Sequence, residues 1–232
     1  IMIFNQFFDE VSSTFTYLIS SGKGREALII DPVLEKTHEY ISYLKKLDLK
    51  LVKVIDTHIH ADHISGLKEL HKQTNCTLIM GENSRSEVVN LKIKDNEKIK
   101  IENIEVISMY TPGHTDCSYS FLMKDRIFTG DTLLINGTGR TDFQNGNPID
   151  QYHSLFQRIL KLPENFFVYP AHDYKGNKVS TIGDEKRNNP RLKVKSADQY
   201  AELMNNLNLD NPKIMDVAVP ANITGKTLDE LN

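Results

Sequence analysis

The chain has 232 residues, of which 39% are hydrophobic and 25% charged, and its formal net charge is −3 at pH 7. These values are typical of a globular protein with one large core, and they give no electrostatic reason to expect binding to DNA or RNA. No apolar stretch approaches the length of a membrane span, and the first residues do not resemble a secretion signal. We therefore expect no membrane partner and a cytoplasmic location. Cys76 and Cys117, a single even pair in so long a chain, are weak evidence for a disulfide and agree with a reducing compartment.

Apolar periodicity predicts strands and helices that alternate along the chain. First come an antiparallel strand pair (14–19 and 27–31), a helix (35–47), a strand (51–55), a helix (64–72) and a short strand (77–80). Two hairpins follow, one within 98–109 and one formed by 118–123 and 126–129. A helix (149–160), a strand (166–169) and a helix in the polar tail (197–207) complete the pattern. This order favours an α/β (α+β) fold in which two mixed sheets form a sandwich flanked by helices.

A dense group of histidine and aspartate residues directly follows the strand 51–55, in the segment Thr57-His58-Ile59-His60-Ala61-Asp62-His63. Residues two apart in extended backbone point the same way, so His58 and His60 can both reach one centre beyond the strand end. Asp62 and His63 follow where the chain turns toward the next helix. A loop of surface histidines is the alternative, but His and Asp at this spacing are typical of metal sites.

Three further candidate ligands follow later strands in the same way. His114 lies in the Pro-Gly turn of Tyr110–Thr115, Asp131 follows the apolar run 126–130, and His172 follows the run 166–171. One such residue alone is more often a cap or a turn former than a ligand. Their recurrence after successive strands indicates a metal site at one edge of the sheets, because functional groups gather on loops that a rigid scaffold carries.

These residues resemble a known superfamily. His58-x-His60-x-Asp62-His63 with His114, Asp131 and His172 is similar to the metal motif of the metallo-β-lactamase superfamily, whose fold is an αβ/βα sandwich with its metal site at one edge. More narrowly, the chain resembles the glutathione persulfide dioxygenases in the segments Thr129–Ile135, Gly139–Gln144, Pro170–Tyr174 and Asn189–Leu192. The resemblance runs from about Phe7 to about Asn222. It implies one metallo-β-lactamase-like domain over residues 1–232, with 175–232 as a C-terminal extension that packs on it.

The resemblance also implies a cofactor and a reaction. One Fe(II) per chain would be held by His58, His114 and Asp131, since two imidazoles and one carboxylate leave coordination positions open for substrate and dioxygen. The implied reaction converts glutathione persulfide, dioxygen and water to glutathione and sulfite. Zinc is an alternative or substituted metal. A homodimer is expected, and any sulfurtransferase that acts with this chain is expected to be a separate protein.

The residues themselves leave the number of metal ions open. In the one-iron interpretation His60, Asp62, His63 and His172 orient the ligands and manage protons around the catalytic centre. All seven residues that hold two zinc ions in superfamily hydrolases are nevertheless present. With two metals the chain would be a dinuclear zinc thioester hydrolase of the hydroxyacylglutathione hydrolase (glyoxalase II) type. A non-catalytic module clamped by zinc is disfavoured, because structural zinc sites are usually closed by Cys and His at short spacing.

Other candidate residues surround this centre. Tyr174 follows His172 by two positions, so its hydroxyl could reach the open metal positions as a catalytic and substrate-binding group. Arg191 could bind a glutathione carboxylate, although a solvated basic face is nearly as good an explanation. Met204 matches a position that lines the thiol pocket in the family, yet it also fits a helix core. Arg140 and Asp142 are expected to form an ion pair that supports the loop after Asp131.

A cysteine nucleophile is not expected. Thr138 occupies a position where some members of the family have cysteine, and Cys117 follows Asp116 where a glycine is common. Cys117 is better interpreted as a small buried residue.

Overall fold

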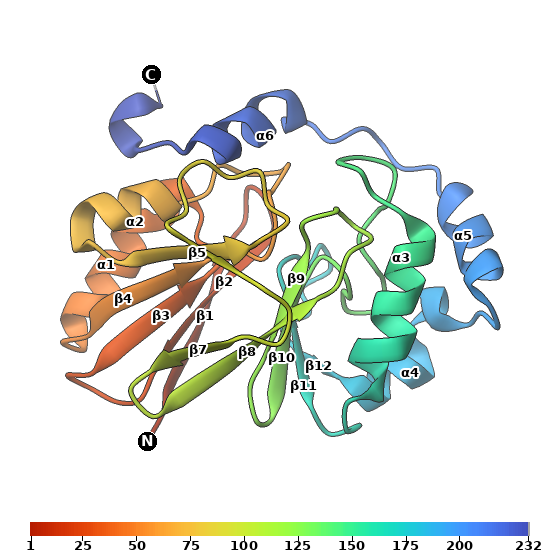
Figure 1. Ribbon diagram of the computed structural model, residues 1–232, viewed down its shortest axis with the longest axis horizontal. Helices are drawn as coiled ribbons and strands as arrows, with labels where there is room; N and C mark the ends of the chain where they lie inside the picture. Colours follow the sequence, from red (N-terminus) through yellow and green to blue (C-terminus); the bar gives the residue numbers. More distant parts are fainter. Residues whose placement is uncertain (232) are drawn as a thin grey trace.

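Two six-stranded mixed sheets pack face to face in the computed structural model, which describes residues 1–231 (Figure 1). The first sheet has the order β1–β2–β3–β4–β5–β6, with β1 Ile3–Asp9, β2 Thr14–Ser20, β3 Glu26–Ile30, β4 Lys50–Ile55, β5 Thr77–Gly81 and β6 Leu91–Ile93. The second has the order β12–β11–β10–β9–β8–β7, with β7 Lys98–Ile101, β8 Ile104–Tyr110, β9 Tyr119–Leu122, β10 Arg126–Gly130, β11 Phe167–Pro170 and β12 Ser180–Thr181.

Helices cover the outer face of each sheet (Figure 1). The helices α1 Thr37–Lys46 and α2 Leu67–Thr74 lie against the first sheet. The second is covered by α3 Pro148–His153, which continues as a π turn and a 3-10 turn to Lys161, by α4 Ile182–Asn188 and by α5 Ala197–Asn205. After α5 the chain runs over the top of the molecule to α6 Met215–Thr224. Short 3-10 turns lie at Leu34–Lys36, Pro190–Leu192 and Leu228–Glu230.

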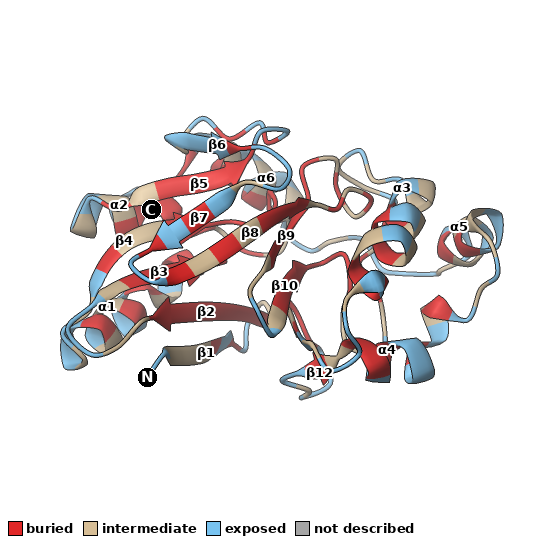
Figure 2. Cartoon of the chain, turned by 60° about the horizontal axis from the view of Figure 1, so that its bottom comes forward, coloured by how far each residue is buried: buried red, intermediate tan, exposed pale blue. Residues whose placement is uncertain are grey.

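The alternation of side chains along the strands builds the layers. In β2, Phe15, Tyr17 and Ile19 face the second sheet and join the core between the sheets. Leu18, between them, points the other way and packs in the core under α1 and α2. A third core lies between the second sheet and α3, α4 and α5. Figure 2 shows the central strands as almost wholly buried, whereas the outer faces of the helices are exposed. The sandwich of two mixed sheets flanked by helices is thus confirmed.

The predicted strands and helices are present, and five further elements were missed. The strands β6 and β12 have three and two residues, too few for a periodic pattern. Helix α6 carries Pro220 in its interior and has no apolar stripe, and α4 offers only Ile182 as an apolar anchor. The strand β1 was also missed. The helix expected at 64–72 begins at Leu67.

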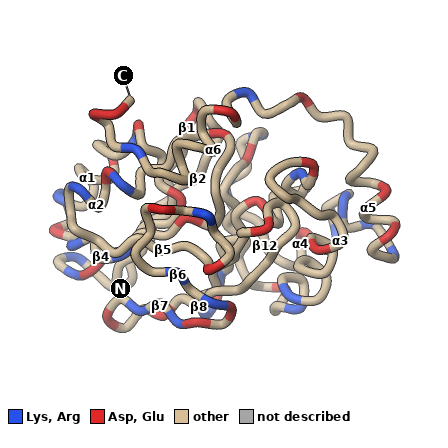
Figure 3. The backbone as a smooth tube through the Cα atoms, turned by 45° about the horizontal axis from the view of Figure 1, so that its top comes forward, with Lys and Arg blue, Asp and Glu red and all other residues tan. Residues whose placement is uncertain are grey.

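Three observations bear on the expectations about compartment and partners. Cys76 and Cys117 are both buried free thiols, so the two cysteines do not form a disulfide. No helix within residues 1–231 is long and apolar enough to cross a membrane. Charges of both signs are dispersed over the molecule (Figure 3), which agrees with the small net charge.

Candidate metal centre

The candidate ligands meet at the edge of the sandwich where the carboxyl ends of four strands lie. His58 follows β4 of the first sheet, whereas His114, Asp131 and His172 follow β8, β10 and β11 of the second sheet. His58 Nε2 and His114 Nε2 lie 3.6 and 3.4 Å from the same carboxylate oxygen, Asp131 Oδ2. His58 and Asp131 are buried, and the His114 side chain is 13% exposed. The centre is therefore built across both sheets.

Hydrogen bonds direct the Nε2 atoms of both histidines toward Asp131. The Thr57 hydroxyl donates to the Asp31 carboxylate (3.0 Å to Oδ2), which leaves its oxygen to accept from His58 Nδ1 at 2.9 Å. His114 Nδ1 donates to the Arg140 carbonyl at 2.6 Å. With the proton of each ring on Nδ1, both Nε2 atoms carry a free lone pair. Burial lowers the pKa of His114 to about 4, against the opposing effect of Asp131, so the ring is neutral at pH 7.

The donor set fits a single metal ion. Two ligand atoms that are each about 2.1 Å from one ion, at 90–110° to each other, lie about 3.0–3.4 Å apart. The two His–Asp separations of 3.4 and 3.6 Å are close to this range. The remaining side of the group opens toward a cavity. Two neutral imidazoles and one carboxylate with open positions are the donor set of non-haem Fe(II) oxygenases, and zinc accepts the same atoms.

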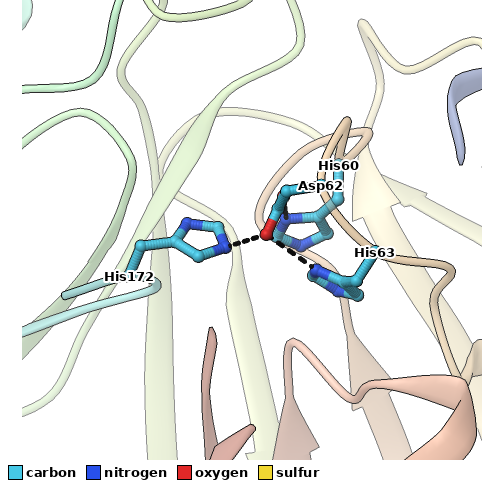
Figure 4. A group of neighbouring side chains, drawn as sticks. All are labelled: His60, Asp62, His63 and His172. Carbon is cyan, nitrogen blue, oxygen red and sulfur yellow. Dashed lines mark hydrogen bonds and ion pairs between the residues drawn. The ribbon is translucent and has the colours of Figure 1, made fainter. Parts of the chain in front are cut away.

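A second group of side chains lies beside the first. Figure 4 shows the Asp62 carboxylate between the rings of His60, His63 and His172. Asp62 Oδ2 is 2.5 Å from His172 Nε2 and 3.3 Å from His63 Nδ1, and Asp62 Oδ1 is 4.0 Å from His60 Nδ1. The ligand atoms of this group lie within 4.8 Å of one another. All seven residues expected at the site are thus brought together, in two adjoining groups.

His172 joins the two groups through one short hydrogen bond and one close ion pair. Its Nδ1 lies 2.6 Å from Asp131 Oδ1, while its Nε2 faces Asp62. Burial alone would lower the pKa of His172, but the two carboxylates outweigh it and raise that pKa well above the usual value. For both carboxyl groups burial acts upward, yet the charge of His172 holds each pKa well below its ordinary value. An imidazolium carries a proton on each nitrogen and therefore has no lone pair for a metal.

His60 and His63 each keep one nitrogen without a partner. His60 Nε2 donates to Asp31 Oδ1 at 2.9 Å, which leaves Nδ1 as a buried lone pair. Burial lowers the pKa of His60 to about 4. His63 Nδ1 lies 3.2 Å from the Thr14 hydroxyl, and its Nε2 is buried and without a hydrogen bond to the described chain. A buried polar atom is rarely left without a hydrogen bond, and a bound ligand would give these two nitrogens a partner.

Sequence reasoning missed four residues that support these groups. Asp31 and Thr57 hold the rings of His60 and His58, as described above. The Thr14 hydroxyl, at the start of β2, lies 3.0 Å from His172 Nε2. Asn222 of α6 donates to the carbonyls of His60 (2.9 Å) and His63 (2.8 Å) and accepts from Ser65 N (2.7 Å). Asp31 has the same signal as Asp131, an acid directly after a strand; Thr14 has no comparable signal.

A cavity of about 570 Å³ opens onto the first group, and His114 and Asp131 are among the residues that line it. Tyr174 and Arg191 both line it. The Tyr174 ring lies parallel to that of His172, with 6.2 Å between centroids, and its side chain is mostly exposed. Arg191 is half-buried and donates through Nη1 to the Thr138 carbonyl. Both residues can therefore contact a molecule in the cavity.

Three other candidates take supporting positions. Arg140 lines the cavity and forms a bidentate ion pair with Asp142, at 2.7 and 2.8 Å. Its Nη1 also donates to the Asp210 carbonyl at 2.7 Å, which ties the segment after α5 to this loop. Met204 is buried in the core below α5, with its sulfur 3.6 Å from the Thr138 hydroxyl. It lies behind the wall of the cavity and is not among the residues that line it.

Comparison with known proteins agrees with this geometry. A profile described as the metallo-beta-lactamase superfamily matches residues 9–172. The mouse protein "Persulfide dioxygenase ETHE1, mitochondrial" is 41% identical over 96% of this chain and 88% of its own length, and its human counterpart gives the same values. The crystal structure of ETHE1 from Myxococcus xanthus superimposes with a TM-score of 0.92 at 46% identity, covering 95% of this chain and 97% of that one. A hydroxyacylglutathione hydrolase of Dictyostelium discoideum is 34% identical over 69% of this chain and 62% of its own length.

Proposed function

Because this chain belongs to the metallo-β-lactamase superfamily and, within it, to the persulfide dioxygenases, which are oxidoreductases, we propose that it holds one Fe(II) and oxidises glutathione persulfide. The reaction would be GSSH + O₂ + H₂O → GSH + SO₃²⁻ + 2H⁺. The observation that carries the one-iron proposal is the position of the His172 ring between two carboxylates. Its Nδ1 is hydrogen-bonded to Asp131 and its Nε2 forms an ion pair with Asp62, so we infer that His172 supports Asp131 and does not bind a second ion.

Iron would be held by His58 Nε2, His114 Nε2 and the Asp131 carboxylate, and it would supply the redox chemistry that lets dioxygen react with sulfur. The chain itself holds the ligands in place. The Thr57 hydroxyl and the Arg140 carbonyl keep the proton of each imidazole on Nδ1. His172 keeps one Asp131 oxygen engaged, so that carboxylate presents its other oxygen, Oδ2, to the two Nε2 atoms.

The cavity suits a thiol that carries carboxylates. Arg191 lines its wall, and no carboxylate among residues 1–231 neutralises the guanidinium, whose pKa burial lowers. A glutathione carboxylate would provide the missing partner, and the planar guanidinium can bind it with two hydrogen bonds. Tyr174 also lines the cavity, next to His172, and its hydroxyl would donate to the substrate near the reacting sulfur. These contacts support glutathione persulfide as the substrate.

A dinuclear zinc thioester hydrolase is the second candidate. The unpartnered atoms His60 Nδ1 and His63 Nε2 favour it, because a second ion in that group would use both. In such a site Asp131 would be among the residues that hold the ions, and the ions would supply an activated water for thioester hydrolysis. This candidate is disfavoured because His172 would have to lose a proton to bind the second ion, although the ring lies between two carboxylates that stabilise its charged form. The mouse persulfide dioxygenase is also 41% identical over 96% of this chain, whereas the Dictyostelium hydrolase is 34% identical over 69% of it.

The deciding experiment is metal analysis of protein purified without oxygen, combined with two assays on the same sample. We expect about one iron per chain and oxygen uptake with glutathione persulfide. Hydrolysis of a glutathione thioester should be absent. Two tightly bound zinc ions, thioester hydrolysis and no oxygen uptake would instead identify the hydrolase. Bound zinc with neither activity would identify a metal-clamped module.

Four further expectations remain proposals. They are a single domain with 175–232 packed on it, a homodimer, a separate sulfurtransferase partner and a cytoplasmic location, for which the two free thiols are the support.

A further inference from the structure

A buried glutamine lies between the two loops that carry metal ligands of the second sheet. Gln151 of α3 is 0% exposed, and its Nε2 donates to the Gly139 carbonyl at 2.9 Å. On its other side it packs against Gly113, where a Cβ atom would lie only 2.2 Å from Gln151 Cβ. Gly113 precedes His114, and Gly139 precedes Arg140, whose carbonyl binds His114. The glutamine thus contacts the backbone on both sides of this ligand.

The same contacts reach Asp131. Gly139 N donates to the Asp131 carbonyl at 2.8 Å, and a Cβ at Gly139 would lie 2.1 Å from that oxygen. The loop from Asp131 to Arg140 therefore folds back on itself at Gly139. The Gln151 amide is hydrogen-bonded to the carbonyl of this glycine. A displacement of Gly139 would move the Asp131 backbone and the Arg140 carbonyl together.

A tyrosine of the C-terminal segment fixes the glutamine. The Tyr200 hydroxyl of α5 donates to Gln151 Oε1 at 2.5 Å and lies 2.8 Å from the Thr138 hydroxyl. Tyr200 is also 0% exposed. Because Gln151 Oε1 faces Tyr200, its NH₂ group must face Gly139, so the hydroxyl sets the orientation of the amide. A chain of hydrogen bonds then runs from Tyr200 through Gln151 to the ligand loops.

From this chain we infer that Gln151 and Tyr200, here called the Gln151–Tyr200 bridge, are positioning residues for the metal centre. Neither contacts the metal ligands' donor atoms or the cavity. The bridge sets the place of the Arg140 carbonyl and hence the direction of His114 Nε2. The inference rests on the metal centre of the proposed function and is independent of the reaction that occurs there.

The test uses cobalt(II) binding to the full-length apoprotein. Tyr200→Phe removes only the hydroxyl, and Gln151→Met removes the amide at nearly constant volume. Each should raise the cobalt dissociation constant about tenfold and shift the visible absorption bands of bound cobalt, which report ligand geometry. The double variant should bind cobalt about as well as either single variant, since both changes break the same chain of contacts.

Tyr119→Phe is the matched control. Tyr119 is buried, and its hydroxyl lies 3.2 Å from Asn83 Oδ1, away from the bridge. Cobalt affinity and spectrum should stay as in the wild type in this variant. Melting temperatures of the apoproteins will show how far each substitution destabilises the fold. Unchanged cobalt affinity and spectrum in Tyr200→Phe and Gln151→Met would overturn the inference even if both melt earlier, as would equal losses in Tyr119→Phe or additive losses in the double variant. Wild-type protein that binds cobalt normally but shows no oxygen uptake when loaded with iron would overturn the proposed reaction alone.

Discussion

Replacing Arg191 with lysine tests how the cavity recognises the thiol that carries the sulfur. Arg191 lies in the 3-10 turn Pro190–Leu192, and its guanidinium reaches the cavity wall while donating to the Thr138 carbonyl. Burial removes water from the guanidinium and lowers its pKa, and no carboxylate within residues 1–231 compensates for this effect. The guanidinium is therefore available to pair with a carboxylate of the substrate. Lysine keeps the charge but presents a single point of contact in place of the planar fork.

The expected loss can be estimated from one hydrogen bond. A hydrogen bond to a charged group contributes about 1.5–3 kcal/mol, and the lower end applies because Arg191 is only half-buried and solvent screens its charge. A loss of about 1.4 kcal/mol corresponds to a tenfold change in an equilibrium constant. Because this contact is remote from the reacting sulfur, Arg191→Lys should raise KM about tenfold and leave kcat and iron content nearly unchanged.

Oxygen consumption measured against glutathione persulfide concentration gives both constants. Cysteine persulfide, which lacks the distant carboxylates of glutathione, should show the same KM with wild type and variant. Arg187→Lys is the matched control, because Arg187 of α4 is paired with Asp184 of the same helix and with Glu164, and it does not line the cavity. An unchanged KM for glutathione persulfide would refute the reasoning. An equal rise with cysteine persulfide would show that Arg191 acts on the cavity wall and not on a carboxylate.

Three further outcomes follow from the metal centre. Asp131→Ala removes the only carboxylate of the ligand set and should abolish iron retention; iron that stays bound through gel filtration would contradict this. His60→Ala should keep most of the iron while activity or metal affinity falls ten- to a hundredfold, and complete metal loss would instead place His60 among the ligands and revive the hydrolase. Chelation should lower the melting temperature, because the ligands come from both sheets: at free metal about 1,000 times the dissociation constant the bound ion stabilises by about 4 kcal/mol, or very roughly 8–16 °C for a chain of this size. Calorimetry that shows no shift would exclude a tightly bound ion.

The sequence predicted those site residues that are typical metal ligands and that directly follow an apolar strand. His114 and Asp131 each follow an apolar strand, and successive strands of this fold end at one edge, so their meeting could be anticipated. The residues that hold the histidine rings in place could not be anticipated. Asp31 is 29 residues from His60. Thr14 looks like any strand residue until the second sheet brings His172 to it, because no periodicity reports which strands of two sheets become neighbours.

Two other differences between expectation and structure arise because packing in the folded chain cannot be read from local sequence. Met204 satisfies both a helix-core pattern and a family position, and only packing places it behind Thr138. Helix α6 was missed because Pro220 and an even apolar surface conceal it. It nevertheless supplies Asn222, which binds the backbone of the loop from His60 to His63. Short or unusual elements thus carry side chains that the site depends on, and their local sequence gives little sign of it.

The burial of both thiols has a consequence for an enzyme that handles persulfides. Cys76 and Cys117 are 2% and 4% exposed, and burial raises the pKa of each. Sulfane sulfur moves between molecules by thiolate attack, as disulfides exchange, so a thiol that stays protonated and out of reach does not take part. The polypeptide therefore does not compete with its own metal centre for the substrate's outer sulfur. Activity should persist after treatment with a bulky alkylating reagent, and repeated turnover should leave no persulfide on the protein.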